Sequence, residues 1–138
     1  MKIFFSLIFI IPSFLNAQTF TNYSVNDGLI DNSVNCISID GNNNVWIGTQ
    51  NGISKFDGTT WTSYTNAIDS GIVNNTINAI CALSNGNIWI GTDFGASLYD
   101  GNTWTPYTTS NGLADDRINH IAEKSDGSIW FSDYDGIT

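Results

Sequence analysis

The chain has 138 residues, with thirteen acidic and four basic side chains and a formal net charge of −9 at pH 7. Such an acidic chain repels the phosphates of nucleic acids and anionic lipids, so neither class is expected as a partner. Twelve of the acids are aspartates, and they accompany eighteen asparagines and thirteen glycines. These residues favour turns over helix interiors, which predicts an almost all-β chain after residue 17.

The first 17 residues have the composition of a secretory signal peptide. Lys2 precedes an apolar run from Ile3 to Leu15, and the small residue Ala17 follows. A first transmembrane helix is the alternative, but the run is shorter than the ~20 residues that span a bilayer, and Pro12 interrupts it. We expect cleavage near Ala17 and export to the periplasm or the extracellular space. The remaining thirteen acids and three bases then carry a net charge of −10.

A sequence repeat fills the rest of the chain. The stretch "NVWIGTQNGISKFDGTTW" at 44–61 returns as "NIWIGTDFGASLYDGNTW" at 87–104, with eleven of eighteen positions identical. Trp46 and Trp89 are 43 residues apart, and Trp130 follows after 41 more. A period of about 40 to 45 residues is typical of a β-propeller blade of four short strands. We therefore predict all-β propeller blades of four antiparallel strands, about two and a half of them.

In chain order, residues 18–24 are predicted to be an outer strand, because "QTFTNYS" matches the later segments "WTSYT" and "WTPYT". Blade 1 is expected at 25–65, blade 2 at 66–108 and a truncated blade 3 at 109–138. A leftover outer strand at the amino terminus is what a closed propeller of about 4 to 8 blades uses to complete its last blade. We thus expect further blades of the same parent chain, in a total that the sequence leaves open.

Turn residues divide each blade into strands A to D. Strand A is expected at 34–39, 77–82 and 118–123, strand B at 45–49, 88–92 and 129–132, strand C at 53–56 and 96–99, and strand D at 61–65 and 104–108. The A–B turns are Asp40-Gly41, Asn85-Gly86 and Asp126-Gly127, and the C–D turns are Asp57-Gly58 and Asp100-Gly101. Strand A is apolar on both faces, so neighbouring blades should cover both. Gly48 and Gly91 are expected to admit a neighbouring aromatic side chain.

Cys36 and Cys81 raise the question of a disulfide in an oxidising compartment. They fall at different positions of successive repeats, on apolar strands where a small buried thiol suits a core. Two core thiols are therefore favoured over a bridge.

The stretches "SGIVNNTINAICALSNGNIWIGTDFGASLYDGNTW" and "NGL…DDRINHIAEKSDGSIWFSD…GI" resemble the two-component regulator propeller repeat. The resemblance covers essentially the whole chain after the leader. It implies the secreted, periplasmic sensory part of a hybrid histidine kinase of Gram-negative bacteria, typically seven-bladed and responsive to carbohydrate-derived ligands. Phosphotransfer would then lie outside these residues, and this segment would be a non-enzymatic ligand-binding sensor without a cofactor, metal or catalytic residue.

The antiparallel order places the B–C and D–A loops on one rim, where propeller ligands usually bind. The B–C loops supply Gln50, Asn51, Asp93, Phe94, Asp133 and Tyr134, and the D–A loops supply Asp31-Asn32, Asn74-Asn75, Asp115, Asp116 and Arg117; His120 lies on the adjoining strand A. Aromatic faces beside amides and carboxylates suit a carbohydrate or another small polar ligand. Unconstrained loop drift explains the same variation between blades, so both interpretations stay open.

Three other features have competing explanations. His120 is the only histidine and could serve acid–base chemistry, although a polar substitution on an inner strand explains it more simply. Asp115-Asp116 could pair as acid and base, but adjacent acids before a strand are more often a turn and a cap. "DGNNN" at 40–44 resembles the start of a calcium loop without its final glutamate, so a turn is favoured. The alternatives to a sensor are a lyase-type or hydrolase-type propeller enzyme and a secreted adhesion or scaffold protein.

Overall fold

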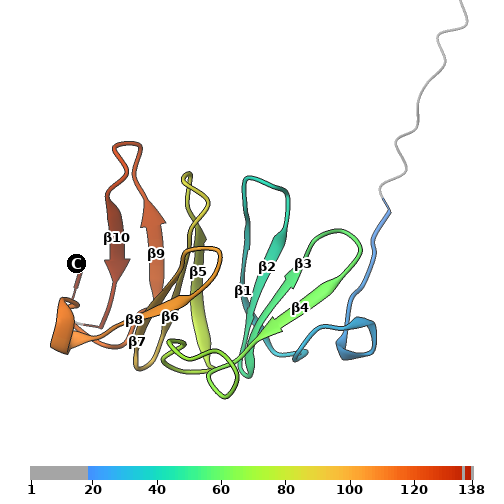
Figure 1. Ribbon diagram of the computed structural model, residues 1–138, viewed down its shortest axis with the longest axis horizontal. Helices are drawn as coiled ribbons and strands as arrows, with labels where there is room; N and C mark the ends of the chain where they lie inside the picture. Colours follow the sequence, from blue (N-terminus) through green and yellow to red (C-terminus); the bar gives the residue numbers. More distant parts are fainter. Residues whose placement is uncertain (1–18, 135, 138) are drawn as a thin grey trace, which may run out of the picture.

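The computed structural model describes residues 19–134, 136 and 137, so the leader predicted at 1–17 lies outside the described residues. Three antiparallel sheets stand side by side (Figure 1). Their strands are β1 (Val34–Ile39), β2 (Val45–Thr49), β3 (Gly52–Phe56) and β4 (Trp61–Tyr64) in blade 1, β5 (Ile77–Ala82), β6 (Ile88–Thr92), β7 (Gly95–Tyr99) and β8 (Trp104–Tyr107) in blade 2, and β9 (His120–Glu123) and β10 (Ile129–Ser132) in blade 3. The short 3₁₀ helices η1 (Val25–Asp27) and η2 (Thr109–Asn111) precede β1 and β9.

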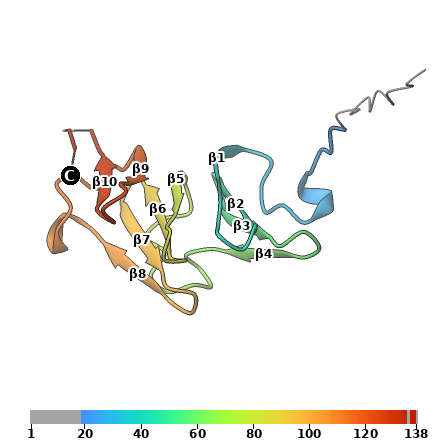
Figure 2. The ribbon, with the colours of Figure 1, turned by 90° about the horizontal axis from the view of Figure 1, so that it is seen from above.

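Each complete sheet is a meander, with the strand orders β1-β2-β3-β4 and β5-β6-β7-β8. Strand β1 packs beside β5, and β5 packs beside β9, so the first strand of each sheet is the innermost (Figure 2). This arrangement confirms the predicted propeller blades. Within the part of the chain that the structure describes, no helix is long and apolar enough to cross a membrane.

The predicted strand limits are close to those observed, with one larger difference in blade 3. There the first strand begins at His120, two residues later than predicted. The reason is that the Ile118 N–H donates to the Thr92 carbonyl of blade 2, at 2.8 Å, instead of entering its own sheet. This hydrogen bond connects two neighbouring blades.

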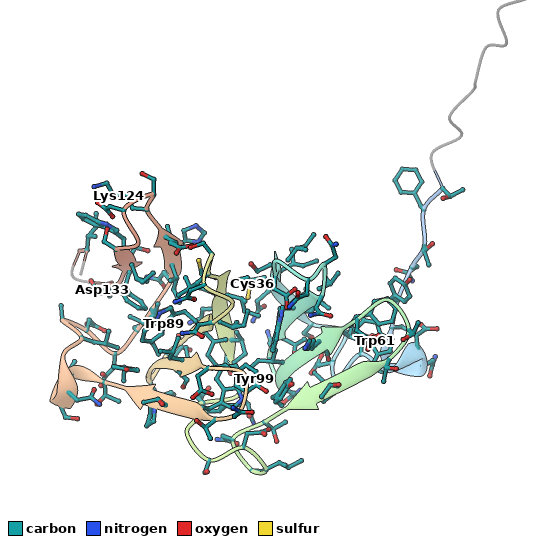
Figure 3. All side chains as sticks on the ribbon, turned by 45° about the horizontal axis from the view of Figure 1, so that its top comes forward. Cys36, Trp61, Trp89, Tyr99, Lys124 and Asp133 are labelled. Atoms are coloured by element: carbon teal, nitrogen blue, oxygen red, sulfur yellow. The ribbon has the colours of Figure 1, made fainter. Side chains whose placement is uncertain are left out.

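The apolar core lies between blades. One cluster joins Trp46 and Ile53 of blade 1 to the blade 2 residues Ile72, Ile77, Ile80, Ile88, Ile90 and Trp104. A second joins blade 2 to blade 3 through Ala79, Leu83, Trp89, Ala96, Ile118, Ile121 and Phe131. Tyr99 lies between the first two blades, with its ring centroid 5.8 Å from that of Trp46 and 5.6 Å from that of Tyr64 (Figure 3). Each blade therefore buries its apolar face against its neighbour.

The glycines of strand B admit an isoleucine of the next blade, which corrects the expectation of an aromatic. A Cβ atom at Gly48 would lie 2.7 Å from Ile77 Cγ2, and one at Gly91 would lie 2.8 Å from Ile118 Cβ. Ile77 and Ile118 are both fully buried and begin the innermost segment of their blades. The same close approach thus sets the spacing of both blade pairs.

The first A–B turn differs from its prediction at Asp40-Gly41. In blades 2 and 3 the left-handed residues are Gly86 and Gly127, as expected, with φ of 91° and 83°. In blade 1 that conformation falls on Asn43, with φ of 63°, and not on Gly41. The reason is that the hydrogen bond from the Asn43 N–H to the Asp40 carbonyl places Asn43, and not Gly41, at the left-handed end of the turn.

Both cysteines are free thiols. Cys36 packs against Gly48, and its Sγ atom lies 3.9 Å from the Ile77 carbonyl oxygen of the next blade. Burial raises the pKa of the Cys36 thiol to about 11, so little of the reactive thiolate is present at neutral pH.

Candidate functional site

The B–C and D–A loops gather at one end of the sheets, and the A–B hairpins extend from the other (Figure 1). This places the predicted loop rim at the lower edge of the view. The candidate loop residues therefore share a rim, but they make different contacts there.

One group of candidates forms a cluster across blades 2 and 3. The Arg117 Nε atom lies 3.5 Å from Asp93 Oδ1, and its guanidinium carbon lies 5.7 Å from the centre of the Tyr134 ring. Arg117 and Asp93 are both well exposed, and 75% of the Tyr134 surface is accessible. An exposed ion pair of this kind adds little stability. The cluster thus offers a cation, a carboxylate and an aromatic face to a ligand.

Asn78 joins this cluster, and the loop-based prediction missed it. Its Nδ2 atom donates to Asp93 Oδ1 at 2.9 Å and to the Ile118 carbonyl of blade 3 at 3.2 Å. Asn35 makes the equivalent bond to the Ile77 carbonyl of blade 2, at 3.0 Å. The repeated dipeptides Val34-Asn35, Ile77-Asn78 and Ile118-Asn119 were the available signal in the sequence.

Phe94 projects from the same B–C turn as Asp93, with 61% of its surface accessible. The Thr92 hydroxyl donates to the Gly95 carbonyl at 2.8 Å and accepts from the Phe94 N–H at 3.0 Å. The buried threonine therefore holds the turn while the aromatic ring faces solvent. Thr49 builds the corresponding turn in blade 1, where Asn51 stands in place of Phe94.

Blade 1 contributes a second, smaller polar pair, in which Asn51 donates to Asp31. The Ser33 backbone N–H and the Asn51 amide both lower the pKa of Asp31, with Ser33 having the larger effect. The neighbouring Gln50 carbonyl accepts from the Thr76 hydroxyl of the next D–A loop at 3.5 Å. The first contact joins two loops of blade 1, and the second joins blade 1 to the next D–A loop.

Asp115 and Asp116 have structural roles in their loop. The Asp115 carboxylate accepts the Arg117 N–H and the Asp116 carboxylate accepts the Thr109 N–H, each at 2.6 Å. The same two bonds are made by Asp31 and Asn32 in blade 1 and by Asn74 and Asn75 in blade 2. Because the bonds recur at the same places in all three loops, these positions shape the rim rather than distinguish one blade from another.

The last two candidates lie away from the cluster surface. Asp133 is buried, at the position that Thr49 and Thr92 occupy in the other blades. His120 is exposed at the start of β9 and in register with Cys36 and Ala79, which both pack toward the next blade. That position therefore lies on the face of blade 3 that points away from blade 2, and not on the loop rim.

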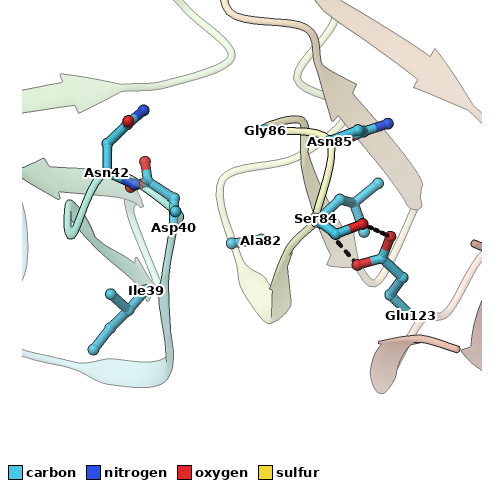
Figure 4. Close-up of a pocket in the computed structure, with 10 residues that line it drawn as sticks. Ile39, Asp40, Asn42, Ala82, Ser84, Asn85, Gly86 and Glu123 are labelled. Atoms are coloured by element: carbon cyan, nitrogen blue, oxygen red, sulfur yellow. Dashed lines mark hydrogen bonds between the residues drawn. The ribbon is translucent and has the colours of Figure 1, made fainter. Parts of the chain in front are cut away.

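The opposite rim holds a hollow of about 570 Å³ between the A–B hairpins, lined by Ile39, Asp40, Asn42, Ser84, Asn85 and Glu123 among others (Figure 4). Glu123 accepts two hydrogen bonds from Ser84, at 2.8 Å from the N–H and 2.7 Å from the hydroxyl.

The Asp40 carboxylate accepts from the Asn42 and Asn44 backbone, the Asn44 amide and Trp46 Nε1, at 2.8 to 3.0 Å. The Asp40 carboxylate therefore caps its own turn, and its oxygens are already bonded to these four donors. This arrangement favours a turn over a calcium loop. Over the described residues, no group of three or more potential ligands could hold a metal ion.

Comparison with known proteins identifies the repeat. A family model described as "Two component regulator propeller" matches residues 28–51, 71–94 and 112–135. Among solved structures, the extracellular domain of a hybrid two component system from B. thetaiotaomicron aligns with 87% of this chain at a TM-score of 0.74 and 24% identity. This chain spans 17% of that protein domain's length.

Two structures of virginiamycin B lyase from Staphylococcus aureus show the same fold. They align at TM-scores of 0.59 and 0.58, with 21% and 20% identity, over 76% and 77% of this chain and 36% and 40% of theirs. Among curated proteins, no sequence matches the chain.

Proposed function

Because the chain belongs to the two-component regulator propeller family, we propose that it is part of an exported sensory propeller that binds a small polar ligand on its loop rim. The observation that carries this proposal is the cluster of Asp93, Arg117 and Tyr134. Residues from two blades meet there, because neighbouring sheets bring their loops together on this rim. The export signal proposed for residues 1–17 would bring this rim to a ligand outside the cytoplasm.

A carbohydrate is the ligand class that best fits the chemistry. Tyr134 and Phe94 expose aromatic faces that can stack on the apolar side of a sugar ring, while Arg117, Asp93 and Asn78 present donors and acceptors to its hydroxyls. The Arg117–Asp93 pair is solvent-exposed, so its partners can exchange toward a ligand at low cost. Signalling would follow if the bound ligand favoured one packing of the loops or blades over another.

The test is ligand-observed NMR of the exported protein with a panel of neutral and anionic oligosaccharides. We expect at least one sugar to bind, and Tyr134→Ala and Arg117→Ala each to weaken its affinity about tenfold or more, as when one stacked ring or charged hydrogen bond is removed.

The matched control is Lys124→Ala on the opposite rim. Lys124 also forms an exposed ion pair, with its Nζ atom 2.6 Å from Asp126, so this variant removes the same charge and a similar contact. Affinity should stay unchanged in the control. If Lys124→Ala weakened binding as much as Arg117→Ala, net charge and not the cluster would govern binding, and the site would be rejected.

An enzyme of the lyase or hydrolase type is a second candidate, favoured only by His120 as an exposed imidazole. His120 is in register with Ala79, which packs between blades 2 and 3, and it lies away from the cluster, so we favour a structural position for it. Replacing His120 with alanine in the whole protein should leave ligand binding unchanged. A turnover that disappears with this substitution would favour the enzyme instead.

A further inference from the structure

Another hollow lies where the D–A loop that leads into blade 2 meets the start of β8, the outermost strand of that blade. Its volume is about 390 Å³, and its walls are Ile68, Asp69 and Ser70 of the loop and Asn102, Thr103 and Trp104 of the blade. This volume lies in the range of small-molecule sites, about 300 to 1,000 Å³. The hollow shares no residue with the rim cluster of Asp93, Arg117 and Tyr134, so it is a separate feature of the surface.

The loop on one side of the hollow is two residues longer than its counterparts. From the residue that begins the turn to the glycine that ends it, blade 2 has "TNAIDSG" at 65–71, whereas blades 1 and 3 have "SVNDG" at 24–28 and "TTSNG" at 108–112. Ile68 stands in this longer turn with 81% of its surface accessible. Insertions in repeat proteins fall in loops, and such loops often carry binding sites.

The longer loop changes what its glycine contacts. In blade 1, a Cβ atom at Gly28 would lie 2.6 Å from Trp61 Cδ1, the ring atom that is bonded to the indole nitrogen. In blade 2, a Cβ atom at the equivalent Gly71 would instead meet the backbone carbonyl of Trp104. The insertion therefore moves the glycine away from the nitrogen-bearing edge of the indole, and the hollow lies beside Trp104.

Trp104 has a buried indole N–H without an acceptor. Only 6% of the Trp104 surface is accessible, and its Nε1 atom makes no hydrogen bond to any residue that the structure describes. The buried indole of Trp46, by contrast, donates to Asp40 at 2.9 Å. Because an unpaired buried donor destabilises a protein, an acceptor that enters beside Trp104 gains more than one on an open surface would.

The polar groups around Trp104 indicate which ligand fits. Asp69 uses its Oδ2 atom to accept the Thr65 N–H at 2.9 Å. Its Oδ1 atom, the Ser70 hydroxyl and the Asn102 side-chain amide make no hydrogen bond within the described residues. A hydroxyl group can accept from the indole and donate to the carboxylate, whereas an anion would be repelled by Asp69. The chemistry therefore favours a neutral polyhydroxyl ligand.

We propose that this hollow is a second ligand site, which takes a neutral sugar or polyol independently of the loop rim. One ligand oxygen accepts the Trp104 indole N–H, and a neighbouring hydroxyl donates to Asp69, while Ser70 and Asn102 bind further hydroxyls. Because the indole nitrogen is covered, the exposed turn at Ile68 moves aside to admit the ligand. The two extra residues of the loop thus supply the site.

The test follows the indole N–H signals in NMR spectra of the full-length protein with isotope-labelled tryptophan, and Trp104→Phe identifies the signal of Trp104. We expect glucose and myo-inositol, a neutral sugar and a neutral polyol, to shift this signal in a saturable way. Glucuronate should bind more weakly, because Asp69 repels its carboxylate. No saturable shift with either neutral probe would overturn the proposal, and tighter binding of glucuronate would contradict a neutral ligand.

The matched control shortens the loop. A variant without Ala67 and Ser70 has the loop length of blades 1 and 3 and keeps Asp69 three positions after the start of the turn, where Asp27 lies in blade 1. It should keep the other indole signals in place, because the other two blades use this length, and lose the response of Trp104. Tyr134→Ala on the loop rim should leave that response unchanged, which separates a failure of this site from a failure of the rim site. A response that survives the deletion, or that disappears with Tyr134→Ala, would mean that the sugar binds elsewhere and would overturn the proposal.

Discussion

At some equivalent positions of the repeat, the blades carry different residues in the same backbone conformation. The repeat aligns Asn43 with Gly86 and Gly127, and all three adopt the left-handed conformation in their A–B turns. Only glycine adopts it without a steric cost, and asparagine is one of the few other residues that tolerate it. A substitution that exchanges the two residue types should therefore change stability in a known direction.

We predict that Asn43→Gly raises the free energy of unfolding, by up to about 1 kcal/mol, because it relieves the left-handed strain. The reverse exchange, Gly86→Asn in the second blade, should lower it by a similar amount, since a Cβ atom there meets no neighbour within 4 Å. Urea titration followed by tryptophan fluorescence measures both. Destabilisation by Asn43→Gly would show that the asparagine side chain itself supports the turn.

Two buried tryptophans differ in whether the indole N–H has a hydrogen-bond partner. Trp46 donates its indole N–H to Asp40 at 2.9 Å, whereas the buried Trp104 Nε1 has no hydrogen-bond partner in the described structure. Replacing Trp46 with phenylalanine removes both packing contacts and a charge-assisted hydrogen bond. It should therefore lower the free energy of unfolding by about 1.5 to 3 kcal/mol more than the loss of the packing contacts alone would. Trp104→Phe should cost less, because it also removes an unsatisfied donor. Equal losses in urea titrations of the two variants would contradict this assignment.

At the scale of strands and loops, the sequence predicted most of the fold. The repeated aspartate and glycine turns, with the apolar segments between them, placed the observed strand limits within a residue or two. The exception, the late start of β9, could not be predicted because a neighbouring blade takes the Ile118 N–H. The same limit applied to the site: the meander predicted the rim, but the contacts of Asn78 and Arg117 across blades depend on how the sheets pack.

The packing of one sheet on the next leads to a prediction for Gly91. Its alanine variant would push a methyl group into Ile118, so we expect a loss of about 1 to 3 kcal/mol, typical of overpacking. Gly41→Ala is the matched control, because Gly41 has no left-handed φ and a Cβ atom there meets nothing within 4 Å. Denaturation of both variants measures the difference. A neutral Gly91→Ala would show that the two blades are not held at this spacing.

In blades 1 and 2, a buried serine holds the D–A loop to its blade. Ser54 accepts the Ile30 N–H at 2.9 Å, and Ser97 accepts the Val73 N–H at 3.2 Å. Ser97→Ala should lower the free energy of unfolding by about 1 to 3 kcal/mol, because it leaves the Val73 N–H without its acceptor. Hydrogen exchange at Val73 should become faster, while Ser63→Ala on the exposed part of β4 should change neither quantity. Unchanged exchange in Ser97→Ala would mean that the serine does not hold the loop.

At the scale of the whole molecule, turn aspartates determine the response to acid. In Asp57 and Asp100, backbone N–H groups of the turn lower the carboxyl pKa, and in Asp126 the hydrogen bonds from Lys124 and Ser128 lower it to about 2. A carboxyl whose folded pKa lies below its unfolded value stabilises the fold above the unfolded value and loses that effect as the pH falls. The unfolding midpoint should therefore be constant near neutrality and fall below about pH 4.

The Asp126→Asn variant provides the check, because it removes one of these carboxyls without changing its shape. Its unfolding midpoint should depend less on pH between about 4 and 2 than that of the unaltered protein. A midpoint that falls between pH 7 and 5, or an unchanged slope in the variant, would show that other groups govern acid unfolding.

The repeat units are successive propeller blades, each covering its neighbour's apolar face, and the loop rim depends on this claim. The most direct test is a crystal or cryo-electron microscopy structure of the full-length product. We predict a closed ring in which residues 19–24 pair as the fourth strand of the last blade, with Arg117, Asp93 and Tyr134 together on the loop rim. A structure in which residues 19–24 pair with no other repeat, or in which the repeats form separate sandwiches, would contradict the account.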